Sequence, residues 1–151
     1  MGRIMDTVEQ YLRDDDWHYE QIEGQDILKF GIKADNSTYN IYCDIRDDTD
    51  QLMLYVVMGQ EIPEEKRLAA AEYITRANYG LKIGNFEMDM SDGQIRYKVS
   101  LDVEDGTLSH KMIANMIGAG VGTMDRYFPG FMSISFAGKS PEDTINEIEG
   151  Q

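Results

Sequence analysis

Apolar residues at the start of the chain recur at the spacing of one helix face. Ile4, Val8 and Leu12 lie on that face, which predicts a helix over residues 3–14. Three aspartates at 14–16 follow, and carboxylates at a helix C-terminus oppose the helix dipole. We therefore expect the first helix to end there.

The spacing of apolar residues changes to two in the next part of the chain. Alternation over residues 28–32 and 39–45, with turn residues between them, predicts two antiparallel strands. Residues 52–58 are apolar at nearly every position, which indicates a strand that is covered on both faces or used in a subunit contact. Residues 17–22 are a weaker candidate for a preceding strand.

Two more helices are predicted in the second half of the chain. The first begins near Pro63, carries a stripe of mostly small residues and ends near Gly80, so we expect it to pack closely on a sheet. The second is a long apolar helix that ends at Pro129. A short segment at 131–136 and a terminal helix or loose tail at 138–151 follow it.

The segment between these two helices predicts a hairpin. Asp92-Gly93 has the composition of a two-residue turn. Such a turn pairs Glu87 with Lys98 and Phe86 with Val99, which puts opposite charges on one face and apolar side chains on the other. The order of elements is then α-β-β-β-α-β-β-α, an α+β fold with helices packed on an antiparallel sheet.

Composition limits the class of protein. Of the 151 residues, 14 are Lys or Arg and 28 are Asp or Glu, which gives a net charge of −14. The 42% of hydrophobic residues can fill one core, so we expect a single domain over 1–151 with its core at about 3–137. The chain has no cluster of cations for a nucleic-acid backbone and no run of about 18 apolar residues for a membrane span. We therefore expect neither nucleic acid nor membrane as a partner.

The N-terminus and the cysteine content favour the cytoplasm. The first residues lack the apolar segment of a secretory signal. Cys43 is the only cysteine, so no intramolecular disulfide can form. A reducing compartment is consistent with both features.

No set of residues stands out as a catalytic or metal site. The aspartates at 47–50 lack the glycine and the distal glutamate of a calcium-binding loop. His18 and His110 lie in different predicted elements, and Cys43 lies on the apolar side of its strand. We expect no catalytic residue, no metal and no cofactor, and hence a protein that is not an enzyme.

Two glycine-containing motifs are similar to phosphate-binding loops without matching them. Gly138-Lys139-Ser140 follows Ser133, where a P-loop needs its first glycine. The run Gly118–Gly122 lies inside a predicted helix, where each glycine costs about 1 kcal/mol. Close packing or a binding groove would explain that cost. The groove alternative makes the protein a small-ligand or nucleotide sensor that binds through Gly118, Gly120, Gly122 and Thr123.

Several segments together resemble the bacterial YbjN family, whose members are described as sensory transduction regulators. They are the run from Asn78 to Asp89, the Asp92-Gly93 turn, the strand Ile95-Arg96-Tyr97 and the run from Met124 to Pro129. The resemblance covers about residues 20–136. It implies an α+β domain similar to type III secretion chaperones, usually able to dimerise, and it implies no catalytic residues.

Our preferred hypothesis is a cytosolic binding protein that acts as a regulator or a chaperone-like adaptor through protein contacts. The last long helix contains surplus methionines, and flexible Met-rich surfaces suit varied protein partners. We expect a homodimer and a protein client. The residues expected to contact a partner are Leu54, Val56, Met112, Met116 and Val121.

Overall fold

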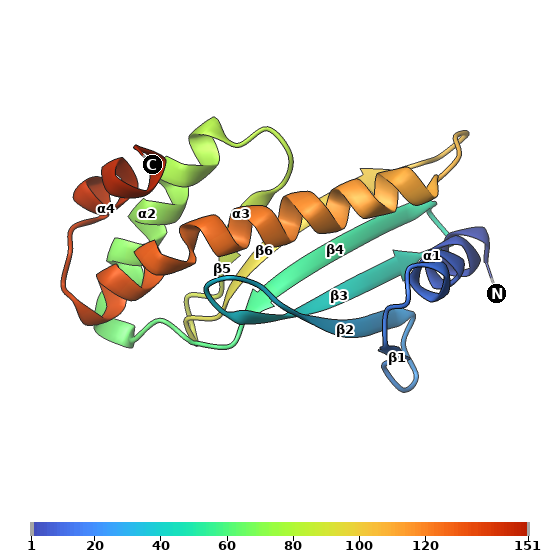
Figure 1. Ribbon diagram of the computed structural model, residues 1–151, viewed down its shortest axis with the longest axis horizontal. Coiled ribbons are helices and arrows are strands. Elements are labelled where there is room, and N and C mark those ends of the chain that lie inside the picture. The colour runs from blue at the N-terminus through green and yellow to red at the C-terminus, as the bar shows by residue number, and fades with distance from the viewer. Residues whose placement is uncertain (1, 151) are drawn as a thin grey trace.

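The computed structural model describes residues 2–150 (Figure 1). Its elements, in chain order, are α1 (Arg3–Asp14), β1 (Tyr19–Gln21), β2 (Ile27–Lys33), β3 (Thr38–Arg46), β4 (Gln51–Met58), η1 (Glu64–Lys66), α2 (Arg67–Gly80), β5 (Asn85–Met88), β6 (Ile95–Asp102), α3 (His110–Phe136) and α4 (Pro141–Glu149). The predicted α+β class and the order of its main elements are confirmed. The weak first strand is real but only three residues long.

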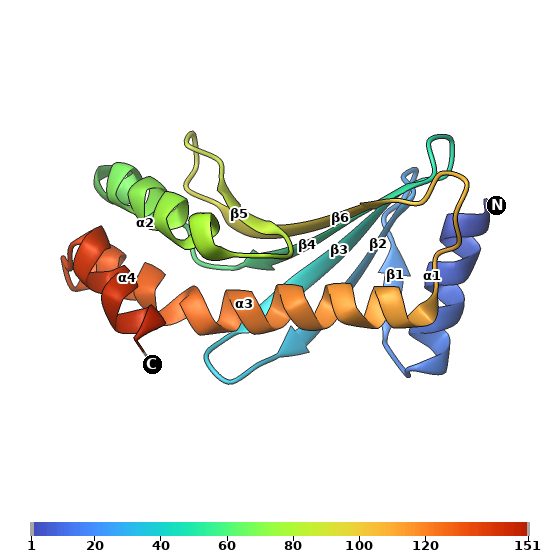
Figure 2. The ribbon, with the colours of Figure 1, turned by 90° about the horizontal axis from the view of Figure 1, so that it is seen from above.

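The strands form one antiparallel sheet in the order β1-β2-β3-β4-β6-β5. The long helix α3 crosses the sheet over β4 and β6, and α1 lies on the same side against β3 (Figure 2). The short helices α2 and α4 lie together at the β5 end. Within residues 2–150 no helix covers the other face of the sheet. Burial along β3 and β4 accordingly alternates between fully buried and partly exposed residues.

Gly120 allows α3 to lie close to the sheet. A Cβ atom at this position would lie 2.9 Å from Cγ2 of Val56 and 3.5 Å from Cδ2 of Leu54. The neighbouring glycines Gly118 and Gly122 have no such neighbour within 4 Å. Close packing therefore accounts for the central glycine of the run and leaves the outer two unexplained.

The prediction that the long helix ends at Pro129 is wrong, because α3 continues to Phe136. Proline has no N–H, so the carbonyl of Asp125, four residues earlier, loses its usual helical partner. Nδ2 of Asn36 takes the place of that partner and donates to the Asp125 carbonyl at 2.8 Å. The β2–β3 turn thereby satisfies the group that the proline leaves free.

The side chain of Asp125 holds the same turn. Its carboxylate accepts hydrogen bonds from the backbone N–H groups of Asp35 at 3.1 Å and Asn36 at 3.0 Å. It also accepts from the Tyr39 hydroxyl at 2.8 Å. Burial raises the pKa of Tyr39 and the bond to Asp125 raises it further, so the hydroxyl keeps its proton and remains a donor.

The predicted hairpin register is wrong by two residues. Phe86 pairs with Tyr97 and Glu87 with Arg96, because the turn is longer than two residues. The Asp89 N–H donates to the Gln94 carbonyl at 3.0 Å, which closes the loop. A shift of two keeps every side chain on its predicted face.

The end of the chain forms a helix, the first of the two predicted alternatives. The Ser140 hydroxyl caps α4 by accepting from the Asp143 N–H at 3.1 Å. Ile145 and Ile148 are buried against α2 and α3.

Replacing Gly120 tests the close approach of α3 to the sheet. Gly120→Val puts a branched side chain against Val56, and we expect it to lower the free energy of unfolding by about 2 kcal/mol. Urea denaturation measures this change. Gly118→Ala is the matched control, since its side chain meets open space, and it should gain about 0.5 kcal/mol. Equal stability of Gly120→Val and wild type would contradict the packing argument.

Removing the carboxylate of Asp125 tests its role in holding the β2–β3 turn. Asp125→Ala leaves three donors without their acceptor, and we expect it to cost about 2 kcal/mol in the free energy of unfolding. Glu104→Ala removes an exposed carboxylate that accepts no hydrogen bond within residues 2–150, and it should change stability by less than about 0.5 kcal/mol. Similar urea midpoints for Asp125→Ala and Glu104→Ala would show that the turn does not depend on Asp125.

Candidate functional site

The uncovered side of the sheet carries the side chains that alternate with the core. We call part of this side the open-face surface. It consists of Ile27, Lys29, Tyr42, Met53, Tyr55, Val57, Glu87, Arg96 and Lys98. All of these side chains are partly exposed. Together they present aromatic and apolar groups with cations beside them.

The strand register aligns four of these residues in one row. Lys29 is opposite Tyr42, Tyr42 is opposite Tyr55, and Tyr55 is opposite Lys98. The Lys29 ammonium lies 5.9 Å from the centroid of the Tyr42 ring. The Arg96 guanidinium lies 4.2 Å from the Tyr55 ring centroid, within the range of a cation–π contact. Each tyrosine ring therefore has a cation beside it on the sheet surface.

A groove of about 290 Å³ runs over the two tyrosines. Its lining also includes Ile27, Asp44, Val57, Gln94 and Arg96, so one carboxylate and one guanidinium border it. The groove is partly open to solvent. Such a shape suits an extended chain better than a small enclosed ligand.

Glu87 balances part of the positive charge. Its carboxylate accepts from Arg96 Nε at 2.8 Å and from Lys98 Nζ at 2.9 Å. Burial by itself would raise the pKa of Glu87, but the hydrogen bonds from Lys98 and Arg96 outweigh it and the net shift is downward. The carboxylate is therefore ionised at neutral pH, and one negative charge serves two cations.

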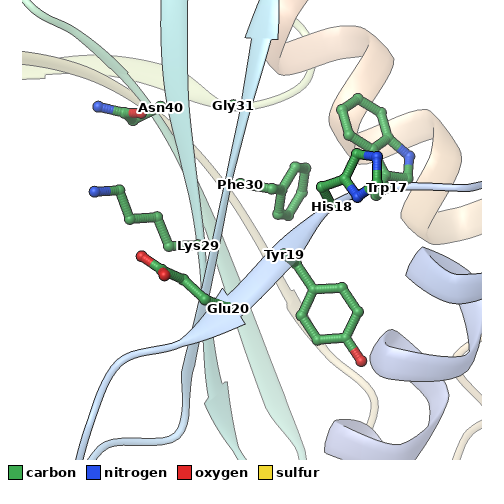
Figure 3. A pocket seen from close by; sticks show the side chains of 8 residues that line it. All are labelled: Trp17, His18, Tyr19, Glu20, Lys29, Phe30, Gly31 and Asn40. Atoms are coloured by element: carbon green, nitrogen blue, oxygen red, sulfur yellow. The ribbon is translucent and has the colours of Figure 1, made fainter.

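A second hollow, of about 490 Å³, lies at the β1 edge of the sheet (Figure 3). Lys29, Glu20 and Asn40 lie on one side of β2 there, and Trp17 and Tyr19 lie on the other with the remaining rings. The Trp17 ring packs against Phe30, with 4.9 Å between ring centroids. Lys29 lines this hollow and also lies beside Tyr42, which lines the groove.

The structure moves three of the predicted partner contacts into the core. Leu54 and Val56 have no exposed surface, and Met116 is only 3% exposed. Met112 and Val121 are partly buried. The first three therefore cannot contact a partner without opening the core, and assigning them to the surface was wrong.

The error on β4 is one of face and not of strand. Leu54 pairs with Cys43 and Val56 with Ile41, so both share the helix-covered face. The side chains of β4 that reach the other face are Met53, Tyr55 and Val57. Pairing β4 with β3 in register and assigning alternate residues of both strands to the same two faces could have identified these side chains.

The residues of the ligand-sensor alternative do not come together. Gly118 and Gly122 are exposed on the outer side of α3, whereas Gly120 faces the sheet. Thr123 is partly buried. Gly122 lines a shallow hollow beside the β2–β3 turn together with Val121 and Asp125. Nothing in the fold tests whether a ligand binds there, so this alternative stays a prediction.

The chemistry of the remaining candidate groups is limited. Cys43 is fully buried, and burial raises the pKa of its thiol to about 12, which keeps it protonated. Residues 2–150 contain no group of three or more His, Cys, Asp or Glu side chains that could hold a metal ion. His18 lines the edge hollow, and His110 packs edge-on against Tyr11. In the described part of the chain, no helix is long and apolar enough to cross a membrane.

A second exposed apolar area lies on the outer side of α2. Leu68 is 80% exposed, Tyr79 is 96% exposed and Ile83, just beyond the helix, is 57% exposed. Leu68 and Tyr79 are eleven positions apart, which is close to three helical turns, so they lie on one stripe. Glu72 and Arg76 form an ion pair of 2.8 Å between them.

The residues that carry the family resemblance hold the hairpin to α2. Asn78 accepts from the Phe86 N–H at 2.8 Å and donates to the Phe86 carbonyl at 3.1 Å. Gly84 has a φ of +79°, and a Cβ atom there would lie 2.5 Å from the Lys98 carbonyl oxygen. The Tyr97 hydroxyl donates to the Ile83 carbonyl. Glu87 and Arg96 lie in the same segments and belong to the open-face surface, so the family resemblance reaches that surface as well.

Comparison with solved structures places this arrangement among known folds. YbjN of E. coli, described as "a putative transcription regulator", aligns with a TM-score of 0.62 and 15% identity over 80% of this chain and 85% of that chain. A chain of the HopA1–SchA chaperone–effector complex aligns with a TM-score of 0.51 and 15% identity over 80% and 89%. A chain of the ExsC–ExsE complex aligns with 0.55 and 9% over 84% and 94%. At these identities the likeness establishes the fold alone.

None of the curated proteins matches the chain in sequence. The sequence model of the YbjN family, described as "Putative bacterial sensory transduction regulator", matches residues 5–132. That match spans every element from α1 to most of α3. The chain therefore belongs to the YbjN family and has the α+β fold that type III secretion chaperones share.

Proposed function

We propose that this protein is a non-enzymatic, cytoplasmic regulator or chaperone-like adaptor that binds another polypeptide through its open-face surface. The observation that carries the proposal is the pair of half-exposed tyrosines, Tyr42 and Tyr55, on a sheet face that no described helix covers. Aromatic side chains supply large contact areas at protein interfaces. Complexes formed by proteins of this fold, among them a chaperone–effector complex, support a protein as the partner.

The second part of the proposal is a homodimer formed through α2. A two-fold axis between residues 73 and 74 brings Leu68 of one protomer beside Tyr79 of the partner subunit, and the reverse contact follows by symmetry. The same axis places the charged pair Glu72 and Arg76 across from its own copy, with both signs present on each side. Burying two large apolar side chains from each protomer supplies a driving force for association.

Capture from a lysate of the protein's own host tests the partner-binding surface. We expect the tagged wild type, cross-linked at low salt, to recover one polypeptide near equal stoichiometry, as identified by mass spectrometry. Replacing Tyr42 and Tyr55 with alanine should abolish its recovery, since their rings form the groove. Phe136→Ala removes a 70% exposed ring at the other end of α3 and should leave recovery unchanged. Equal recovery of the polypeptide by the wild type and by the tyrosine variant would show that the open-face surface does not bind it.

Light scattering tests the dimer. We expect the wild type to have twice the 17.2 kDa mass of one chain, and the Leu68→Lys/Tyr79→Lys variant to have the mass of one chain. Charges at these positions would face each other across the two-fold axis and repel. The Tyr42→Ala/Tyr55→Ala variant serves as the control and should remain dimeric. A wild type of 17.2 kDa at high micromolar concentration would rule the dimer out.

A further inference from the structure

We propose that the segment bound by the open-face surface is extended and acidic, with two carboxylates four residues apart and an apolar side chain midway between them. This inference rests on the proposed function, because it names the chemistry of the partner at the same surface. Its support comes from the charges on this face, from the polar groups left without partners and from the spacing of the cations.

The uncovered face differs in charge from the rest of the chain. By strand register it carries five basic side chains and four acidic ones: Lys29, Lys33, Arg46, Arg96 and Lys98 against Glu20, Asp44, Glu87 and Asp102. The face therefore has a net charge of +1 on a chain whose total is −14. An acidic segment is repelled by the remaining surface and is best tolerated here.

Three groups of this face that can donate a hydrogen bond, on Lys29, Tyr42 and Tyr55, lack a partner among the described residues, and one carboxylate, that of Glu20, also lacks one. Lys29 forms no ion pair within residues 2–150, although Glu20 is its register partner on β1. The hydroxyls of Tyr42 and Tyr55 make no hydrogen bond to any described residue. Arg96 and Lys98 have only the carboxylate of Glu87 between them. A partner rich in acceptors, such as carboxylates, satisfies these groups.

The distance between the outer cations sets the spacing of the carboxylates. Lys29 on β2 and Lys98 on β6 are separated by three strand spacings of about 4.8 Å, or about 14 Å. An extended segment rises about 3.3 Å per residue, so carboxylates at positions i and i+4 reach both lysines. Position i+2 faces the same way and lies over Tyr42 and Tyr55. The apolar side chain belongs at that position.

A designed peptide series tests the inference by fluorescence anisotropy at low salt. The probe is a labelled twelve-residue peptide with Glu at i and i+4 and Leu at i+2, and its counterparts carry Gln or Lys at both Glu positions. We expect the full-length wild type to bind the Glu peptide at least tenfold more tightly than the Gln peptide, and not to bind the Lys peptide. Binding should weaken as salt rises.

Matched charge reversals separate the site from overall charge. Lys29→Glu should weaken binding of the Glu peptide at least tenfold. Lys111→Glu changes the net charge equally but lies exposed on α3, and it should change the dissociation constant less than twofold. Lys29→Gln, with circular dichroism as a check on folding, provides a second variant at the site. Equal losses in Lys29→Glu and Lys111→Glu would overturn the inference.

Other outcomes distinguish this inference from the proposed function. If the Gln peptide binds as tightly as the Glu peptide and Tyr55→Ala abolishes both, the acidic preference is wrong and protein binding at this face stands. If no peptide binds, and the variant with alanine at Tyr42 and Tyr55 captures the polypeptide as well as the wild type does, then both this inference and the proposed binding surface are wrong. Tighter binding of a single-stranded oligouridine than of the Glu peptide would overturn the inference in favour of nucleic acid. Loss of the dimer in Lys29→Glu would overturn it in favour of a second copy of the chain.

Discussion

The close contact between α3 and the sheet determines the rest of this structure. Gly120 lets the helix rest on Val56 and Leu54, so the central part of one sheet face is sealed by a single long helix. The sheet is antiparallel, α3 and α1 lie on one of its faces, and no described helix covers the opposite face. An apolar core on one side and a half-exposed aromatic surface on the other follow from the same packing.

Local patterns in the sequence predict the elements well because periodicity reports which residues face the core. The helix face of α1 and the alternation in β2 and β3 are of this kind. Predictions that depend on distant partners failed. The Asp125 carbonyl, which Pro129 leaves without its helical donor, accepts from Asn36 instead, and Asn36 lies 89 positions away. Likewise, the hairpin turn is longer than two residues, and Gly93 at its end bonds to Ile62 in a different loop.

The proposed binding surface was harder to predict than the fold because β4 is apolar on both faces. Hydrophobicity alone favours Leu54 and Val56, and only their pairing with Cys43 and Ile41 places them inside. The cation–aromatic contacts join residues on different strands, so no window of sequence contains them. The Arg96 guanidinium packs on the Tyr55 ring although the two residues lie 41 positions apart in the sequence.

The contacts that hold the hairpin against α2 differ from the open-face surface, although Glu87 and Arg96 of that surface lie within the segments that resemble the YbjN family. Asn78, Gly84 and Tyr97 fix the hairpin against α2 through backbone hydrogen bonds and close contacts. Lys29 and Tyr55 contribute nothing to those contacts, so their side chains can change without loss of the hairpin. A scaffold held in this way can keep its fold while the chemistry of its exposed face adapts to different partners. For this acidic chain, the near-neutral aromatic face is where a second acidic polypeptide meets the least repulsion.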